Sequence, residues 1–346
     1  MTDNCILVDW FSATTTIYSP VTLIDYLGLD INSFTDLHGF YGYADRLYFG
    51  GISIHYNQRG NDSDKPSVLL EMSGKGCRQF ETSSNRTFYD LFDDVLNGEF
   101  NITRLDVAYD DIDKNGGTGL LDIKKIARFT LHQRFVSKWG SGQILDSFEV
   151  NGNCEPMTHA LTIQFGSTKS DIMLRIYDKA QERGGLDYHW VRAEIVLRRE
   201  RALDFIKNLC THKMPLGKLY SGVLKNYLRF IRMDHSRRER CTVIGWWDSF
   251  LNHADKIKIF TKKEVDYNLS NVCRYVLEQA GNSISVFLSC YGVEELLNQL
   301  HKRKSQLNTN QRRLIADFLE NHPDCYDDVK ETMNILNNPE VLNDLL

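Results

Sequence analysis

The chain has 346 residues, of which 42% are hydrophobic and 25% charged, with a formal net charge of −5 at pH 7. This composition is typical of globular proteins and excludes wholesale disorder, and the length allows two domains of ordinary size. No run of about 18 apolar residues occurs, and no basic segment precedes an apolar one at the start, so we expect neither a transmembrane helix nor a signal peptide. We therefore expect a cytoplasmic protein without a membrane partner.

The charge is unevenly distributed along the chain. Residues 1–120 hold 8 Lys and Arg against 18 Asp and Glu, a net charge of −10, whereas residues 191–240 hold 13 against 5, a net charge of +8. A concentrated cationic block fits a nucleic-acid backbone, although a solvated helical surface has the same composition. Eight cysteines are dispersed without any C-x-x-C pair, which predicts reduced thiols and disfavours a zinc ribbon.

Strands dominate the first 200 residues. Segments rich in β-branched and aromatic residues, each bounded by turn formers, predict strands at 6–15, 46–57, 67–74, 102–111, 160–167, 171–179 and 190–199. Apolar residues at helical spacing predict helices at 21–27, 86–97 and 121–132. This order predicts an α+β fold, with a largely antiparallel central sheet and helices packed on one side.

Helical patterns replace strands after about residue 202. They cover residues 202–210, 218–231, 245–257, 262–280, 284–304 and 310–321. We expect a first domain of residues 1–258 and a helical C-terminal domain of residues 259–346, although no Pro/Gly/Ser-rich linker fixes the boundary. No internal repeat is visible.

One tyrosine stands among charged residues in the segment LRIYDKAQE, residues 174–182. Because side chains alternate along a strand, Arg175, Tyr177 and Lys179 project from one face. A phenol with a reference pKa near 10 attacks a phosphate at neutral pH only if nearby positive charge favours the phenolate or a base removes the proton. The alternative is an amphipathic strand with a surface tyrosine and ion-paired neighbours.

Two further strands carry acids. In residues 102–111, Asp106 and Asp110 share one face with the small Ala108 between them, which leaves room for an ion. Glu194, flanked by apolar residues on another strand, is costly to bury unless it is paired or binds a metal. Such oxygen ligands suit Mg²⁺ or Mn²⁺. A polar edge strand and an ordinary glutamate–arginine pair are the simpler interpretations.

Glycines and cations meet in residues 71–81. Gly74 and Gly76 accompany Lys75 and Arg78, which we interpret as a hairpin turn followed by basic DNA contacts. The segment lacks the G-x-x-x-x-G-K-[ST] spacing of nucleotide hydrolases. No H-x-H or H-E-x-x-H spacing occurs anywhere in the chain, so a zincin or a histidine-ligated nickase is not indicated.

These segments together resemble a known family. In chain order, VDWFSAT, SGKGCRQFE, TRLDVAYDD, LTIQFGSTKSDIMLRIYDKAQE and WVRAEIVLRRERA resemble the replication initiation factor family, which comprises rolling-circle initiators of plasmids and related relaxases of integrative elements and phages. The resemblance covers about residues 5–258. It implies a relaxase-like nicking fold and a metal-dependent endonuclease that cuts one strand of double-strand-origin or transfer-origin DNA and stays joined to its 5′ end through a tyrosine.

The resemblance assigns roles to matching residues. Tyr177 matches the nucleophile, Arg175 and Lys179 match the cations around it, and Glu182 closes that motif. Tyr188 remains a rival nucleophile, although no cation flanks it directly.

The acids of the two other motifs are Asp106 and Glu194. From the chemistry and from what related nickases need, we expect these two to hold Mg²⁺ or Mn²⁺, with Asp110 as a weaker third ligand.

The expected partners are origin DNA, folded as a hairpin at the cut, and a host helicase; the use of a homodimer stays open. The candidate DNA contacts are Lys75, Arg78, Arg192, Arg198 and Arg199. The alternative function is a non-catalytic, sequence-specific DNA-binding regulator with the same fold.

Overall fold

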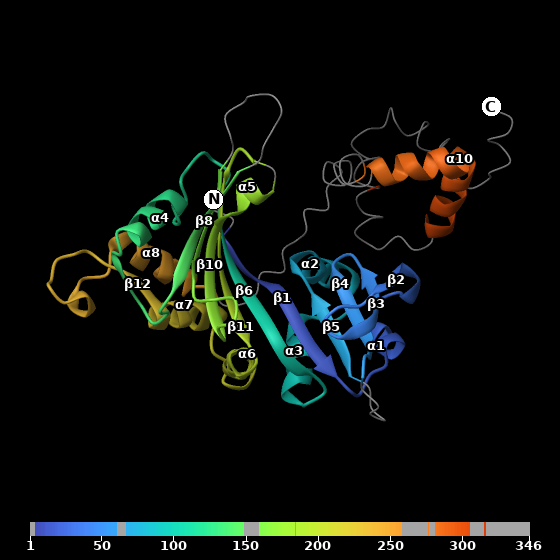
Figure 1. The fold of residues 1–346 in the computed structure, drawn as a ribbon, viewed down its shortest axis with the longest axis horizontal. Coiled ribbons are helices and arrows are strands. Elements are labelled where there is room, and N and C mark those ends of the chain that lie inside the picture. The colour runs from blue at the N-terminus through green and yellow to red at the C-terminus, as the bar shows by residue number, and fades with distance from the viewer. Residues whose placement is uncertain are drawn as a thin grey trace. The chain divides into compact units, whose positions relative to one another are not determined.

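A ten-stranded sheet, antiparallel throughout, forms the centre of the first of two structural units (Figure 1). The structure, a computed structural model, describes residues 4–60, 67–148, 159–183, 185–257 and 281–304, together with the isolated residues 276 and 315. The units are Met1–Lys262 and Lys263–Leu346. We expected the division at 258.

The strands of the large sheet lie in the order β2-β3-β4-β5-β1-β6-β11-β10-β9-β8. Their bounds are β1 Cys5–Thr15, β2 Thr35–His38, β3 Tyr43–Phe49, β4 Ile52–Gln58, β5 Val68–Met72, β6 Asn101–Asp113, β8 Gly142–Phe148, β9 His159–Phe165, β10 Ile172–Asp178 and β11 His189–Arg198. A second sheet pairs β7, Phe135–Ser137, with β12, Leu228–Phe230.

Helices of the first unit connect and cover these strands. They are α1 Pro20–Tyr26, α2 Gly74–Ser83, α3 Phe88–Leu96, α4 Ile123–Leu131, α5 Lys179–Glu182, α6 Glu200–Ile206, α7 Leu216–Tyr227 and α8 Gly245–Ala254. A π-helical turn, Lys207–Thr211, extends α6. Among the described helices, none combines the length and apolar character needed to span a lipid bilayer.

One face of the sheet is packed and the other carries polar side chains. On β1 and β6 the alternating residues Ile6, Val8, Leu105 and Val107 enter a single core, which also takes up the apolar faces of the long helices. Helix α3 is an example of such an apolar face. A capping box at Thr87 begins the helix, and its apolar residues at i, i+3, i+4 and i+7 are buried. The α+β fold with a largely antiparallel sheet and flanking helices is therefore confirmed, and the short helix α5 packs outside this core, against Ile112 and Trp190.

The sheet is built from two halves with the same strand order. In the first half, β1 leads through α1 to the edge strand β2, and a meander of β3, β4 and β5 returns beside β1. In the second half, β6 leads through α4 to the edge strand β8, and β9, β10 and β11 return beside β6. The two halves join where β1 pairs with β6. Our sequence analysis found no repeat because this one is topological.

Three sequence predictions about elements were wrong. Residues 46–57 form a hairpin rather than one strand, because Gly50 and Gly51, both at positive φ, turn the chain between β3 and β4. The segment after Ser73 is the helix α2 rather than a hairpin turn. The helix predicted for 218–231 ends at Tyr227, because the next residues alternate in burial and pair with β7 as a strand.

The second unit is described only over α10, Gly281–Lys304, which contains a kink at Gly292 with φ of 78°. This helix covers the prediction for 284–304. The helices predicted at 262–280 and 310–321 lie outside the described residues, apart from single positions.

Candidate active site

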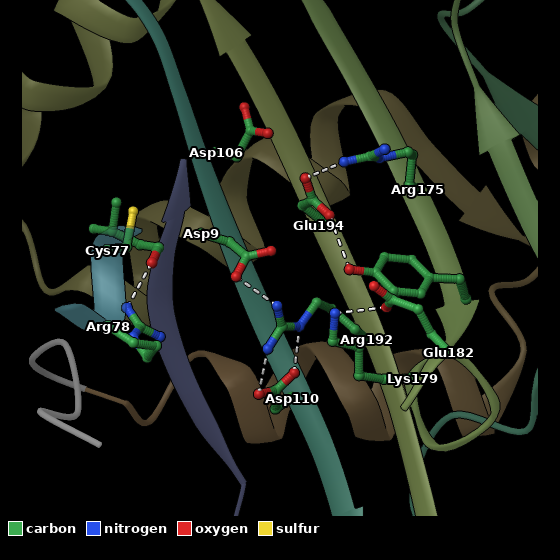
Figure 2. A network of polar contacts seen from close by, with 12 residues as sticks. Asp9, Cys77, Arg78, Asp106, Asp110, Arg175, Lys179, Glu182, Arg192 and Glu194 are labelled. Carbon is green, nitrogen blue, oxygen red and sulfur yellow. Dashed lines mark hydrogen bonds and ion pairs between the residues drawn. The ribbon is translucent and has the colours of Figure 1, made fainter. Parts of the chain in front are cut away.

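The polar face of β6, β11 and β10 brings the predicted residues together (Figure 2). Arg175 lies opposite Glu194, and Tyr177 lies opposite Arg192, in the pairing of β10 with β11. In the pairing of β11 with β6, Glu194 lies opposite Ala108 and Arg192 opposite Asp110. Directly opposite residues point to the same side of a sheet, so register and alternation alone gather these side chains.

Tyr177 and Glu194 form the centre of the site. The Tyr177 hydroxyl donates a hydrogen bond of 3.2 Å to Oε2 of Glu194. Burial, and then the negative charge of Glu194, raises the pKa of the Tyr177 phenol far above its usual value. Of the two ways to activate the phenol, this geometry favours a base that removes the proton over positive charge that stabilises phenolate.

The cations beside Tyr177 are themselves ion-paired. Arg175 donates to Oε1 of Glu194 at 2.5 Å. Lys179 lies 5.4 Å from the centre of the Tyr177 ring and donates to Glu182 at 2.5 Å. Burial, followed by the charge of Arg192, lowers the pKa of Lys179. About a third of the Arg175 side chain (35%) is exposed, so it can still meet a phosphate.

Asp106 and Glu194 are two neighbouring buried acids, each 1% exposed. Arg104 holds Asp106 through two hydrogen bonds of 2.9 and 2.6 Å. Burial and the charge of Glu194 nevertheless raise the pKa of Asp106 well above its usual range. A divalent cation between the two carboxylates would relieve this repulsion, and Ala108, opposite Glu194, limits the side-chain volume there. The two acids therefore fit a metal of the Mg²⁺ class.

Asp110 has a different environment from the other two acids. Both its oxygens accept hydrogen bonds from Arg192, at 2.6 and 2.8 Å. In the part of the chain that the structure describes, no cluster of three or more His, Cys, Asp or Glu side chains could hold a metal. A metal here would have two protein carboxylates and would complete its shell with water or substrate oxygens.

Arg192 is locked inside the protein by two acids. It is 3% exposed and forms an ion pair of 2.6 Å with Asp9 in addition to the pair with Asp110 (Figure 2). Asp9 occupies a bulge in β1, where the pairing with β6 skips from Val8 to Trp10. Burial opposes ionisation of Asp9, but the charges of Arg192 and Lys179 outweigh it and lower the pKa of the Asp9 carboxyl. Arg192 therefore organises the site from within and is not placed to contact DNA.

The other candidate DNA contacts lie on different elements. Arg78, on α2, donates to the Val8 carbonyl and to Glu81, which is a structural arrangement. Lys75 is exposed at the start of α2. Arg198 lies opposite Arg104 on the polar face, and Arg199 is exposed just before α6.

The cationic block is likewise divided by the sheet. Beyond β11, its cations lie on α6 and α7, which pack on the other face of the sheet, or in the segments that follow them. Among the described residues, the cations of this block therefore lie on both sides of the sheet.

Tyr188 lies away from this centre. It stacks on Trp190 with ring centres 6.3 Å apart. It is four residues from Arg192, which corresponds to about 13 Å along an extended strand. In the described part of the chain, Tyr177 is thus the tyrosine that the fold places beside the acids.

Sequence reasoning missed two residues of the site, Asp9 and Arg104. Asp9 belongs to the VDWFSAT segment, but a bulge breaks the alternation from which its direction could be read. Arg104 stands two residues before Asp106 and shares its face, so alternation could have found it.

Comparisons with known proteins find relatives of this chain. Residues 100–300 match the family described as "Replication initiation factor", and residues 5–94 match the "Rolling Circle replication initiation protein N-terminal domain". The chain is 29% identical over 241 residues to "Putative DNA relaxase NicK" of Bacillus subtilis (strain 168), covering 66% of this chain and 65% of that relative. It is also similar to the solved structure of a rolling-circle replication initiator protein from Geobacillus stearothermophilus, with 27% identity, a TM-score of 0.65, and coverage of 74% of this chain and 98% of that one.

Proposed function

We propose that this chain, which belongs to the replication initiation factor family, nicks one strand of origin DNA and becomes joined to the new 5′ end through Tyr177. The observation that carries the proposal is the hydrogen bond from the Tyr177 hydroxyl to Glu194, at the centre of a polar sheet face. A tyrosine bonded to a buried acid has both a nucleophile and a proton acceptor in place.

The reaction conserves the energy of the phosphodiester bond. The Tyr177 oxygen attacks the scissile phosphorus while its proton passes to Glu194, and the bond from phosphorus to the 3′ oxygen breaks. The 3′ oxygen takes up a proton from solvent and leaves as a free hydroxyl, and the 5′ phosphate remains on the tyrosine. Because a phosphodiester is exchanged for another, attack by a 3′ hydroxyl reseals the strand.

Arginines would stabilise charge on the phosphate. Arg104 and Arg175 have 25% and 35% of their side chains exposed, and each bonds one acid of the site. Arg198 lies opposite Arg104 on the same face, and burial and the nearby charges of Arg104 and Arg175 lower its pKa. An anion that enters this cluster is met by several fixed donors.

We propose that Asp106 and Glu194 hold Mg²⁺ or Mn²⁺. When bound, the ion would polarise a phosphoryl oxygen and neutralise developing charge. Addition of Mn²⁺ should raise the melting temperature of the metal-free wild-type protein and leave that of Asp106→Asn unchanged. Equal stabilisation of the two proteins would remove Asp106 from the metal site.

Tyr177→Phe tests the nucleophile. We expect wild-type protein to convert supercoiled origin plasmid to nicked circles with DNA covalently attached, and Tyr177→Phe to give neither product. Tyr188→Phe is the matched control and should nick normally. Undiminished nicking by Tyr177→Phe would overturn the proposal, and sequence-specific binding without any nicking by the wild type would indicate a DNA-binding regulator instead.

The product suggests the next partner. A nicked strand with a free 3′ hydroxyl primes a polymerase only as the duplex is unwound, so we propose that a host helicase acts on this product. A pull-down of helicase by the covalent protein–DNA product, absent with Tyr177→Phe, tests this step.

A further inference from the structure

An exposed aromatic cluster lies on the first half of the sheet, away from the tyrosine site. Phe40, Tyr41 and Tyr48 are 55%, 66% and 36% exposed. The guanidinium of Arg46 lies over two of these rings, 4.8 Å from the centre of Phe40 and 5.2 Å from that of Tyr48. Exposed apolar side chains that gather in one place mark a candidate binding surface. We call these four residues the aromatic platform.

The platform is held in one conformation. Tyr41 adopts a left-handed backbone with φ of 56°, which is strained for a residue with a side chain. Burial and the nearby charge of Glu71 on β5 raise the pKa of the Tyr41 hydroxyl, and the Phe40 N–H donates to Nδ1 of the buried His55 at 3.3 Å. The exposed rings are therefore presented by a fixed turn, and a ligand would find them already ordered.

The platform shares a sheet face with the site. Direct cross-strand pairs connect Tyr48 to Ser53, Ser53 to Glu71, Glu71 to Ser12 and Ser12 to Arg104. Four strand spacings of about 4.8 Å place Tyr48 about 19 Å from Arg104, which bonds the proposed metal ligand Asp106. A strand of DNA only a few nucleotides long spans this distance.

The net charge of the first 120 residues favours single-stranded DNA over duplex DNA as the ligand of the platform. Residues 1–120 carry a net charge of −10, which repels a duplex with one phosphate per about 1.7 Å of its axis. A single strand has half that density, and it exposes the faces of its bases. Aromatic rings with an adjacent arginine are the groups on which unpaired bases stack, whatever their sequence.

We propose that the aromatic platform stacks unpaired bases of the DNA strand that Tyr177 cuts. The proposal rests on the nicking function and adds the state of the substrate: the DNA reaches the site melted, with the single strand laid across β5 and β1 onto the first half of the sheet.

Binding of fluorescein-labelled oligonucleotides by the full chain tests the platform. We expect the double variant Phe40→Ala/Tyr41→Ala to bind a 20-nucleotide oligothymidylate at least about tenfold more weakly than wild type does, because each stacked base contributes measurably to affinity. Affinity for a 20-base-pair duplex should not change. The control Leu131→Ala removes another exposed apolar side chain, 72% exposed on α4, and should bind like wild type.

Two further variants and a crosslinking measurement complete the test. Tyr41→Phe retains the ring and loses the hydroxyl, so it should retain affinity, and Tyr48→Ala serves if the double variant does not fold. Oligonucleotides with 5-iodouracil should photo-crosslink to Phe40, Tyr41 or Tyr48. Unchanged affinity of the alanine variants, an equal loss for single strand and duplex, or crosslinks confined elsewhere would overturn the proposal. Tyr177→Phe should bind the single strand normally, so failure of the nicking function is distinguishable from failure of the platform.

Discussion

The two halves of the sheet share one strand order but bury different side chains. In the first half the buried polar residues of the described strands are uncharged: Ser12, Thr15, Ser53 and His55, whose pKa is lowered to about 4 by burial and by the charge of Arg46. In the second half the buried polar residues include the charged side chains Asp106, Asp110, Asp111, Arg192 and Glu194.

This difference shows where the protein tolerates an electrostatic cost. Removing an ion from water costs several kcal/mol even after relaxation, unless partners and hydrogen bonds replace the water. In the second half, Arg192 lies between two acids and Asp106 is held by Arg104. The described strands of the first half have the same order without buried charges, so this topology does not require them. The buried charges of the second half are therefore best explained by chemistry.

The largest expected effect is on catalysis in the second half. Glu194→Gln keeps the shape but removes the proton acceptor for Tyr177 and the charge that holds Arg175, so we expect nicking to slow by about 10³-fold. Gel assays of nicked-circle formation measure this rate. Glu182→Gln is the control, since Glu182 contacts Lys179 and not Tyr177 in the described structure. A loss of less than tenfold for Glu194→Gln would show that another group accepts the proton.

A matched pair of acid-to-amide variants compares the halves directly. Asp110→Asn leaves the buried Arg192 with one charged partner, and we expect the free energy of unfolding to fall by about 3 kcal/mol. Glu71→Gln, on the half-buried acid of the first half, should cost less than about 1 kcal/mol. Urea unfolding at pH 7, followed by tryptophan fluorescence, measures both. Equal costs would contradict the contrast between the halves.

The sequence predicts which residues share a strand face better than it predicts how the strands of the site are arranged. Alternation within a strand depends only on local geometry, so the shared faces of Arg175 with Tyr177 and of Asp106 with Asp110 could be predicted. Which strands pair, and in which register, depends on packing that no single segment contains. The role of Arg192 was hidden for this reason: its two partners come from β1 and β6, more than 80 residues earlier.

The error at α2 has a similar cause. Gly74 and Gly76 are poor helix formers, so their presence favoured a turn in the sequence analysis. In the structure, a Cβ on Gly76 would lie 2.2 Å from the carbonyl oxygen of Gly51. Glycine is needed there because a helix passes close to the β3–β4 turn, and this long-range approach cannot be read from the segment itself.

The same substitution should therefore have opposite effects in two helices. Gly76→Ala forces backbone apart and should lower the free energy of unfolding by about 2 kcal/mol. Gly222→Ala, on an exposed position of α7 with open space around the new methyl group, should raise it by about 0.5–1 kcal/mol. Thermal unfolding by circular dichroism gives the two signs. A stabilised Gly76→Ala would contradict the close packing of α2 on the first half.

A further effect, on how stability depends on pH, comes from the neutral burial of His55. Because the pKa of His55 is lowered to about 4, below its unfolded value near 6.5, the unfolded chain binds more protons in this interval. The contribution to stability is complete above pH 6.5 and is lost as the pH falls toward 4, by about 2 kcal/mol in total. Protonation also removes the acceptor that Nδ1 offers to the Phe40 N–H, so the turn that carries the aromatic platform should loosen with it.

His55→Asn isolates this effect, since the amide oxygen can accept from Phe40 but does not titrate in this range. The difference in unfolding free energy between pH 7 and pH 4.5 should shrink in His55→Asn and stay unchanged in His212→Asn, which alters an exposed histidine. If both variants keep the wild-type dependence on pH, His55 is not the group responsible.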